Sequence, residues 1–114
     1  MLAAKYSLKG YKNFKRNEKE GKIFQSDSFG VSYFERGDKE TSLFGFIVSN
    51  KISSESTLRH RVKRAMKEAV RSSLPRISLG YNIVFLAKQN VLKRTTEEII
   101  REVREALKQA NLMK

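Results

Sequence analysis

The chain has 114 residues, and its 24 lysine and arginine residues against 12 aspartate and glutamate residues give a formal net charge of +12. This length fits a single domain, and a hydrophobic fraction of 39% distinguishes the chain from basic disordered tails. The absence of cysteine excludes disulfides, thiolate zinc sites and a cysteine nucleophile. The charge excess makes an anionic partner the first hypothesis.

The beginning of the chain carries no recognisable targeting signal. Residues 1–9 lack the apolar core of a signal peptide, and no run in the chain approaches the roughly 20 apolar residues of a membrane span. We therefore expect a cytoplasmic protein without a membrane partner. It should form one domain over residues 1–114, with residues 1–9 flexible.

The first predicted elements are a short helix and two strands. The helix is expected over about residues 11–20, with Gly21 as its carboxyl-terminal stop. The pattern then changes to period two, which predicts a short strand around Phe24 and a longer strand beginning at Phe29, separated by a polar break at residues 26–28. Along the longer strand, one face should carry Phe29, Val31 and Tyr33 and the other Gly30, Ser32 and Phe34.

The next predicted elements are a strand and the most basic helix of the chain. The nearly continuous apolar run of residues 43–49 predicts a strand covered on both faces. A helix is expected over about residues 57–74, capped by Ser56 or Thr57 and ended by Pro75. Its buried stripe should consist of Leu58, Val62, Ala65, Met66 and Ala69. Its remaining arc is basic and consists of Arg59, His60, Arg61, Lys63, Arg64, Lys67 and Arg71, interrupted by Glu68.

Two further elements complete the predicted domain. Residues 81–87 are apolar on both faces and follow a helix, so they should form a strand parallel to residues 43–49. Thr95 and Glu98 form a capping box at the start of the last helix. Its apolar face should carry Ile99, Val103, Ala106, Leu107 and Ala110. The order αβββαβα predicts an α+β fold, a two-layer α/β sandwich with helices on a four-stranded mixed sheet.

The basic helical arc together with the whole-chain charge favours nucleic-acid binding, because cations on one small domain release counterions from phosphates. Arg59, Arg61 and Arg64 are the expected orienting contacts, since the arginine fork makes paired hydrogen bonds to phosphate. His60 has two equal interpretations, an RNA contact or an exposed polar residue. No catalytic constellation, Gly-rich phosphate loop or metal-ligand cluster is visible in the sequence.

The aromatic residues suggest both a core and a stacking platform for unpaired bases. A small sheet domain needs aromatic residues in its interior, so most of them are assigned to the core: Phe29, Tyr33, Phe44 and Phe85. Phe14, with Lys12 and Lys15 beside it, is the best candidate for an exposed platform.

Two linked stretches of the chain resemble the protein subunit of bacterial ribonuclease P. Residues 45–51, followed after a connector by residues 59–64 and Glu68, are similar to the family's strand, lysine connector and Arg-Asn-Arg helix. A second stretch is similar to the family's first helix and the strands after it, through Leu8-Lys9, Phe14-Lys15-Arg16, Gly21-Lys22 and Phe29. The resemblance covers about residues 7–110.

The resemblance implies a fold with a left-handed βαβ crossover around the basic helix. It implies a protein that joins a catalytic RNA, ribonuclease P RNA, whose Mg²⁺ ions cleave the 5′ leader from precursor tRNA. The protein alone is then expected to bind no cofactor or small-molecule substrate and to contribute no catalytic residue. The expected RNA contacts are Lys51, Arg59, His60, Arg61, Lys63, Arg64 and Lys67. The expected leader cleft comprises Lys12, Phe14 and Lys15.

The sequence departs from the family pattern at four positions. His60 replaces the asparagine of the motif, and Asn50 replaces the first lysine of the connector pair. Asn17 and Glu18 stand where the family usually has apolar residues, so leader stacking is expected either to be weaker or to use other groups, and Glu18 could repel leader phosphates.

Two other functions compete with this interpretation. A ribosomal or other structured-RNA scaffold protein would use the same small basic sandwich without a role in cleavage. A DNA-binding module would place residues 57–74 in a major groove, although a face so rich in charge is better suited to phosphates than to base edges.

Overall fold

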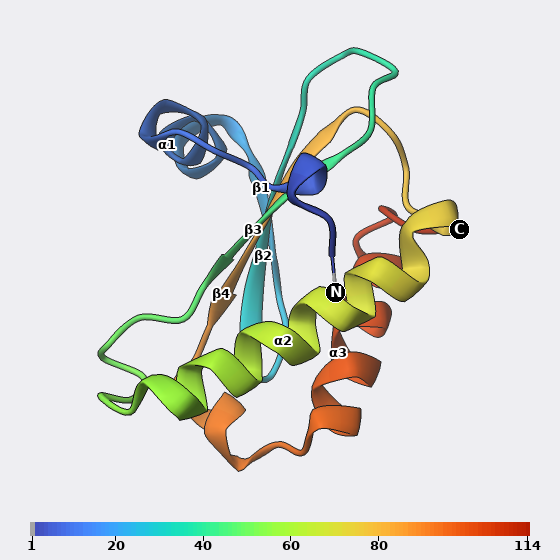
Figure 1. Cartoon of the computed structure of the whole chain (residues 1–114). Helices are drawn as coiled ribbons and strands as arrows, with labels where there is room; N and C mark the ends of the chain where they lie inside the picture. Colours follow the sequence, from blue (N-terminus) through green and yellow to red (C-terminus); the bar gives the residue numbers. More distant parts are fainter. Residues whose placement is uncertain (1) are drawn as a thin grey trace.

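The computed structural model describes residues 2–114 (Figure 1). Its elements, with short 3-10 helices written η, are η1 (Ala4–Tyr6), α1 (Tyr11–Glu20), β1 (Lys22–Gln25), β2 (Phe29–Glu35), β3 (Leu43–Ile47), α2 (Ser56–Ser73), η2 (Leu74–Arg76), β4 (Tyr81–Ala87), η3 (Gln89–Lys93) and α3 (Thr96–Gln109). The strands form one mixed sheet in the order β1-β2-β4-β3. Only β3 and β4 are parallel. The predicted α+β fold and element order are confirmed.

The helices divide unequally between the two faces of the sheet. Helices α2 and α3 lie side by side on one face, and α1 lies on the other (Figure 1). Strand register assigns the side chains: Val31 lies opposite Phe85, and Ser32 lies opposite Val84. Because successive side chains alternate between faces, the first pair points to α2 and α3 and the second to α1.

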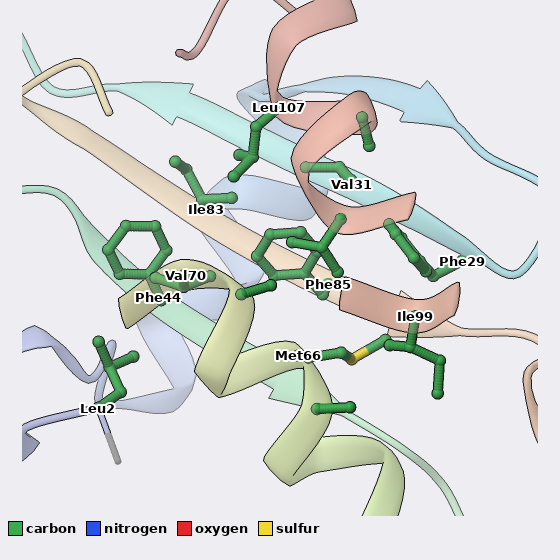
Figure 2. Packing of buried hydrophobic residues seen from close by; sticks show 14 of the residues in the cluster. Leu2, Phe29, Val31, Phe44, Met66, Val70, Ile83, Phe85, Ile99 and Leu107 are labelled. Atoms are coloured by element: carbon green, nitrogen blue, oxygen red, sulfur yellow. The ribbon is translucent and has the colours of Figure 1, made fainter. Parts of the chain in front are cut away.

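The core lies between the sheet and the helix pair α2 and α3. Figure 2 shows Phe29, Val31, Ile83 and Phe85 meeting side chains from both helices. The helical contributions include Met66 and Val70 from α2 and Ile99 and Leu107 from α3, all fully buried. The Phe29 and Phe85 rings meet edge to face at 5.8 Å between centroids. The predicted assignment of Phe29, Phe44 and Phe85 to the core is confirmed, and Tyr33 is half-buried.

The two long helices begin differently. At α3 the predicted capping box is confirmed, because Thr95 Oγ1 accepts from the Glu98 N–H at 3.1 Å and the Glu98 carboxylate accepts from the Thr95 N–H at 2.8 Å. At α2 the predicted caps Ser56 and Thr57 are wrong. The residue before this helix is Glu55, whose side chain makes no capping bond. The hydroxyl of Ser53 accepts from the Glu55 N–H instead, so the turn is closed before the helix begins.

Part of the amino-terminal segment packs against the domain, while the flexibility of residues 1–9 stays a prediction. Leu2 and Leu8 are buried, and the Leu8 N–H donates to the Phe44 carbonyl at 2.8 Å. The reason is that β3 is an edge strand, and a parallel bridge between Ser7 and Phe44 covers part of its exposed backbone. Met1 lies outside the described residues.

The α1 face of the sheet is less covered than the apolar runs of β3 and β4 predicted. Ile47 is 39% exposed and Leu86 is 40% exposed, so the predicted burial of both strands on both faces is wrong at their carboxyl ends. The reason is that α1 has only 10 residues, and it covers Gly45 without reaching over this end. Within residues 2–114, no helix is long and apolar enough to span a membrane.

Candidate RNA interface

The first candidate surface is a basic groove on α2. Four basic side chains line it together with Glu68, namely His60, Lys63, Arg64 and Lys67. At about 100° per residue, these four positions span roughly one quarter of the helix circumference, centred opposite the buried stripe of Val62, Ala65, Met66 and Ala69. Burial of that stripe therefore fixes the rotation of α2 and turns the basic positions outward. We call these four residues the basic stripe.

The basic stripe gathers charge without matching counter-charge. The carboxylate of Glu68, the acidic residue of the groove, forms a salt bridge with Arg71 in the next turn. The Arg71 guanidinium lowers the pKa of Glu68, and Glu68 in turn raises the pKa of Arg71. Arg71 and Glu68 thus largely neutralise each other, so Arg71 contributes less to the groove than its place on the predicted basic arc suggested.

Arg59 and Arg61 make hydrogen bonds within the protein. Arg59 Nη1 donates to the Ser53 carbonyl at 2.7 Å, and Arg61 Nη1 donates to the Arg94 carbonyl at 3.1 Å. Both side chains are half-buried, whereas His60 between them is exposed. The groove thus brings His60, Lys63, Arg64 and Lys67 together, while Arg61 shares a second hollow with Arg64.

The connector before α2 is fixed at several points. Lys51 is exposed, and its carbonyl accepts from Gln89 Nε2 of η3 at 2.6 Å. Ile52 packs against the core, and Arg59 holds Ser53. Lys51 is therefore placed beside the start of α2 by an ordered turn.

The second candidate surface is a cleft between α1 and the open face of the sheet. Its lining combines one aromatic residue with aliphatic and polar ones: Phe14, Asn17, Glu18, Ile23, Ser32, Ile47, Val84 and Leu86. Phe14 lies directly over Gly45, where a Cβ atom would come within 2.7 Å of the ring. Glycine at this position therefore lets the ring approach the strand.

Asn17 fastens α1 to the sheet. It is only 1% exposed, and its Nδ2 donates to the Ser32 carbonyl at 3.1 Å and to the Asn82 carbonyl at 2.8 Å. The Ser32 hydroxyl returns a bond to the Asn17 carbonyl at 3.2 Å. The polar residue that departs from the family pattern thus has a structural use, since it replaces apolar packing by hydrogen bonds to backbone groups.

The other predicted cleft residues lie differently. Phe14 is half-buried against the sheet, so its interpretation as an exposed platform is wrong, although it does form one wall of the cleft. Lys12 and Lys15 are exposed on α1 and do not belong to the cleft lining. At about 100° per residue, Lys12 lies nearly opposite Phe14 on the helix.

Sequence reasoning missed the aliphatic floor of the cleft. Ile23, Ile47 and Leu86 are among the most exposed large hydrophobic residues of the described chain, at 57%, 39% and 40% exposure. Their strand positions share one face, because Ile23 pairs with Ser32, and Ile47 pairs with Leu86. Period-two alternation would have placed them together, but only the position of α1 shows that this face stays open.

No metal site accompanies either surface within residues 2–114, where no three His, Asp or Glu side chains gather closely enough to hold an ion. His60 is the only imidazole of the chain, and it shares its groove with three cations. Glu68 is committed to Arg71. The groove on α2 is therefore suited to binding a polyanion, because four basic side chains line it.

The chain is similar to proteins of one known family over nearly its whole length. The chain matches the family model described as Ribonuclease P over residues 2–111. The ribonuclease P protein component of Clostridium kluyveri is 32% identical over 111 residues, covering 96% of this chain and 97% of that protein. The component from Picosynechococcus sp. is 28% identical over 111 residues, covering 97% and 95%.

Solved structures of known proteins share the fold of this chain. The RNase P protein of Staphylococcus aureus is 27% identical, with a TM-score of 0.88 and coverage of 96% of this chain and 98% of that one. The RNase P protein of Thermotoga maritima shares the fold, with a TM-score of 0.81. The family match extends over nearly the whole chain, and it includes the basic stripe and the cleft. This chain therefore belongs to the ribonuclease P protein family, and its role is that of the protein subunit in tRNA processing.

Proposed function

We propose that the basic stripe and Lys51 dock the catalytic RNA of ribonuclease P, while the cleft beside α1 receives the single-stranded 5′ leader of precursor tRNA. The observation that carries the proposal is the outward stripe of His60, Lys63, Arg64 and Lys67, fixed in rotation by the buried face of α2. Cations held on one rigid face bind phosphates with little further ordering cost. Arg64 adds a planar fork suited to paired hydrogen bonds with phosphate oxygens.

The cleft supports a different kind of contact. Its floor is aliphatic and Phe14 forms a wall, so unpaired bases are held there by their faces. Glu18 on the rim repels phosphates, which favours an orientation with bases inward and backbone outward. Lys12 and Lys15, exposed on the outer side of α1, contribute positive charge near the emerging backbone. This arrangement suits a leader of varied sequence.

In this proposal the bond is cleaved by the RNA and the Mg²⁺ ions that it binds, with the protein as a binding subunit. The protein offers positive charge that reduces phosphate repulsion, so folded RNA needs less Mg²⁺.

A cleavage assay of precursor tRNA tests the proposal. The purified protein alone should leave precursor tRNA intact, and it should lower the Mg²⁺ concentration that the cognate catalytic RNA needs for half-maximal cleavage. The double variant K63A/R64A should lose most of this effect. The double variant R101A/K108A, which removes the same charge from α3, should retain it.

Three results would contradict the proposal. Lack of stimulation by the wild-type protein would remove the role in cleavage, and selective binding of ribosomal RNA would favour a structured-RNA scaffold. Equal loss in both double variants would mean that net charge matters and the basic stripe does not.

A second assay tests the cleft. Substrates with a long leader and with a leader of one or two nucleotides are compared for affinity to the assembled complex. Phe14→Ala should reduce the affinity advantage of the long leader by about 5- to 150-fold, the worth of one stacking contact. The affinity for the short-leader substrate should stay unchanged.

A further inference from the structure

Arg59 and Arg61 flank the basic stripe on opposite sides. At about 100° per residue, they lie roughly 90° and 110° from the centre of the stripe, one toward each side of α2. Each side of the helix adjoins a non-helical segment. The connector, residues 49–55, adjoins one side, and the junction between η3 and α3, residues 93–95, adjoins the other.

Each arginine holds the segment on its own side through a backbone carbonyl. Arg59 binds the Ser53 carbonyl of the connector, and Arg61 binds the Arg94 carbonyl of the junction. Backbone carbonyls of non-repetitive segments lack partners from secondary structure, so a guanidinium N–H is a strong substitute. These contacts exist in the free protein, before any RNA binds.

Each segment carries an exposed lysine. Lys51 lies in the connector, and Lys93 lies at the end of η3, where the junction begins. Further bonds fix both segments, because Gln89 Nε2 binds the Lys51 carbonyl at 2.6 Å and Arg94 Nε binds the Ser28 hydroxyl at 3.1 Å. The basic surface is therefore wider than α2, and its outer parts are held by the two arginines.

We propose that Arg59 and Arg61 are positioning residues, which brace the connector and the η3–α3 junction so that Lys51 and Lys93 extend the RNA-binding surface of the basic stripe. This inference rests on the proposed function for its RNA partner, and it assigns to Lys93 a place on that surface. It also assigns different roles to the residues of the motif. The stripe supplies phosphate contacts, and the two arginines supply the shape of the surface around it.

The alternative is that both arginines are phosphate contacts themselves. A paired contact with phosphate uses two parallel N–H groups on one edge of the guanidinium. Nη1 is committed to a carbonyl in both residues, which leaves the Nε and Nη2 edge as the fork that could still meet a phosphate. The two assignments predict different salt dependence.

The first experiment compares two double variants that each remove two positive charges, R59A/R61A and K63A/R64A. Affinity for the catalytic RNA is measured across a range of salt concentrations. K63A/R64A should reduce the slope of log affinity against log salt by about 1.5, the value for two lost phosphate contacts. R59A/R61A should reduce the slope by less than this, because Lys51 and Lys93 remain on the chain and can still reach phosphates once their segments are released. It should weaken binding by about tenfold at every salt concentration, because the released segments must be ordered on binding.

The second experiment measures amide hydrogen exchange in the free protein, without RNA. R59A should speed exchange in residues 50–56, and R61A should speed exchange around residues 93–96, while the core of α2 stays protected. A variant that only lowers global stability would speed exchange everywhere, so this readout separates bracing from general destabilisation. Lys93→Ala should reduce the salt slope by about 0.7 without altering exchange.

The outcomes separate this inference from the proposed function. Unchanged local exchange in R59A and R61A, or a slope that falls in R59A/R61A as far as in K63A/R64A, overturns the bracing role. An unchanged slope in Lys93→Ala overturns its place on the surface. Failure of the wild-type protein to bind or stimulate the catalytic RNA would refute the proposed function, while the exchange experiment would still decide whether the arginines brace their segments.

Discussion

The two faces of the sheet are built on different principles. The face covered by α2 and α3 is filled by large apolar side chains such as Phe85 and Val31, which are fully buried. The face covered by α1 is joined to its helix by the hydrogen bonds of Asn17 and by one aromatic ring, and it leaves Ile47 and Leu86 exposed. One face supplies stability through apolar burial, and the other keeps apolar surface available for a ligand.

This difference teaches how one four-stranded sheet serves two purposes. Alternate residues of a strand point to opposite faces, so β4 places Phe85 in the core and its neighbours Val84 and Leu86 in the cleft. A residue can therefore affect binding while its immediate neighbour affects folding. The experiments below use such neighbouring or matched positions.

The largest effect is expected from neighbouring residues on β4. Phe85→Ala should cost about 3–5 kcal/mol of unfolding free energy, because it empties the centre of the core. Leu86→Ala should cost about 1 kcal/mol or less, because its side chain is already 40% exposed. Urea unfolding of both variants measures the comparison. Equal costs would show that the cleft face is as important for stability as the core face.

The next effect concerns the close approach of α1 to β3. Gly45→Ala places a Cβ atom 2.7 Å from the Phe14 ring, so the ring must move, at a cost of about 1–3 kcal/mol. The affinity for the 5′ leader should fall because the Phe14 ring is displaced. Gly30→Ala is the matched control on the same face, because its Cβ would meet only the flexible end of Gln25 at 3.4 Å. Similar leader affinity in both variants would mean that the seating of Phe14 is unimportant.

A comparable effect is expected at the polar attachment of α1. Asn17→Ala removes both side-chain bonds to the strands, and it should cost about 1–3 kcal/mol because it leaves a buried gap among polar groups. Asn13→Ala removes an exposed bond to the Lys9 carbonyl and should stay within about 0.5 kcal/mol of the wild type. Thermal unfolding measures both. A small cost at Asn17 would indicate that Phe14 alone holds the helix.

The smallest effect is expected at the cap of α3, on the face of the sheet that α2 and α3 cover. Hydrogen bonds from the backbone and hydroxyl of Thr95 lower the pKa of Glu98 below its ordinary value of 4.5. Because the folded-state pKa is lowered, the stability that the ionised Glu98 carboxylate contributes is complete above about pH 5. It is lost as the pH falls through the folded-state pKa. Glu98→Gln keeps the capping geometry without the charge.

The melting temperatures of wild type and E98Q should therefore differ by about 1–2 °C at neutral pH and converge below about pH 4. Glu97→Gln, in the same exposed turn, serves as the control for general charge effects. A difference between wild type and E98Q that does not change with pH would show that the ionised carboxylate is not what the cap requires.

The local elements were predictable because they depend on short-range patterns. Apolar periodicity placed the basic helix at residues 57–74, against Ser56–Ser73 in the structure. The Thr95 and Glu98 spacing alone identified the cap of α3. The basic stripe also followed from periodicity, because the buried positions of one helix determine which positions face outward.

The attachment of α1 was not predictable, because its partners are distant in the sequence. Asn17 binds carbonyl groups 15 and 65 residues away, and a polar residue on a thinly apolar helix gives no sign of burial. The same applies to Glu102, whose carboxylate accepts from the Ser28 N–H at 2.7 Å and anchors the β1–β2 turn. A helical pattern shows such a residue only as part of a mixed polar face.

The internal bonds of Arg59 and Arg61 have the same explanation. Periodicity places both arginines outside the buried stripe, and a residue outside the stripe is ordinarily assigned to solvent. Their acceptors lie on segments without regular structure, six residues before Arg59 and 33 residues after Arg61. The sequence therefore identified the charged positions, and the tertiary structure was needed to divide them into bracing and outward groups.

The crowding of like charges on the basic stripe makes salt act in opposite directions on the free and the bound protein. Dissolved ions screen the mutual repulsion of Lys63, Arg64 and Lys67, so moderate salt raises the melting temperature of the free subunit. The same ions compete with phosphates and weaken the assembled ribonucleoprotein. In the proposed complex, a subunit that unfolds most readily in dilute buffer therefore binds RNA most tightly there.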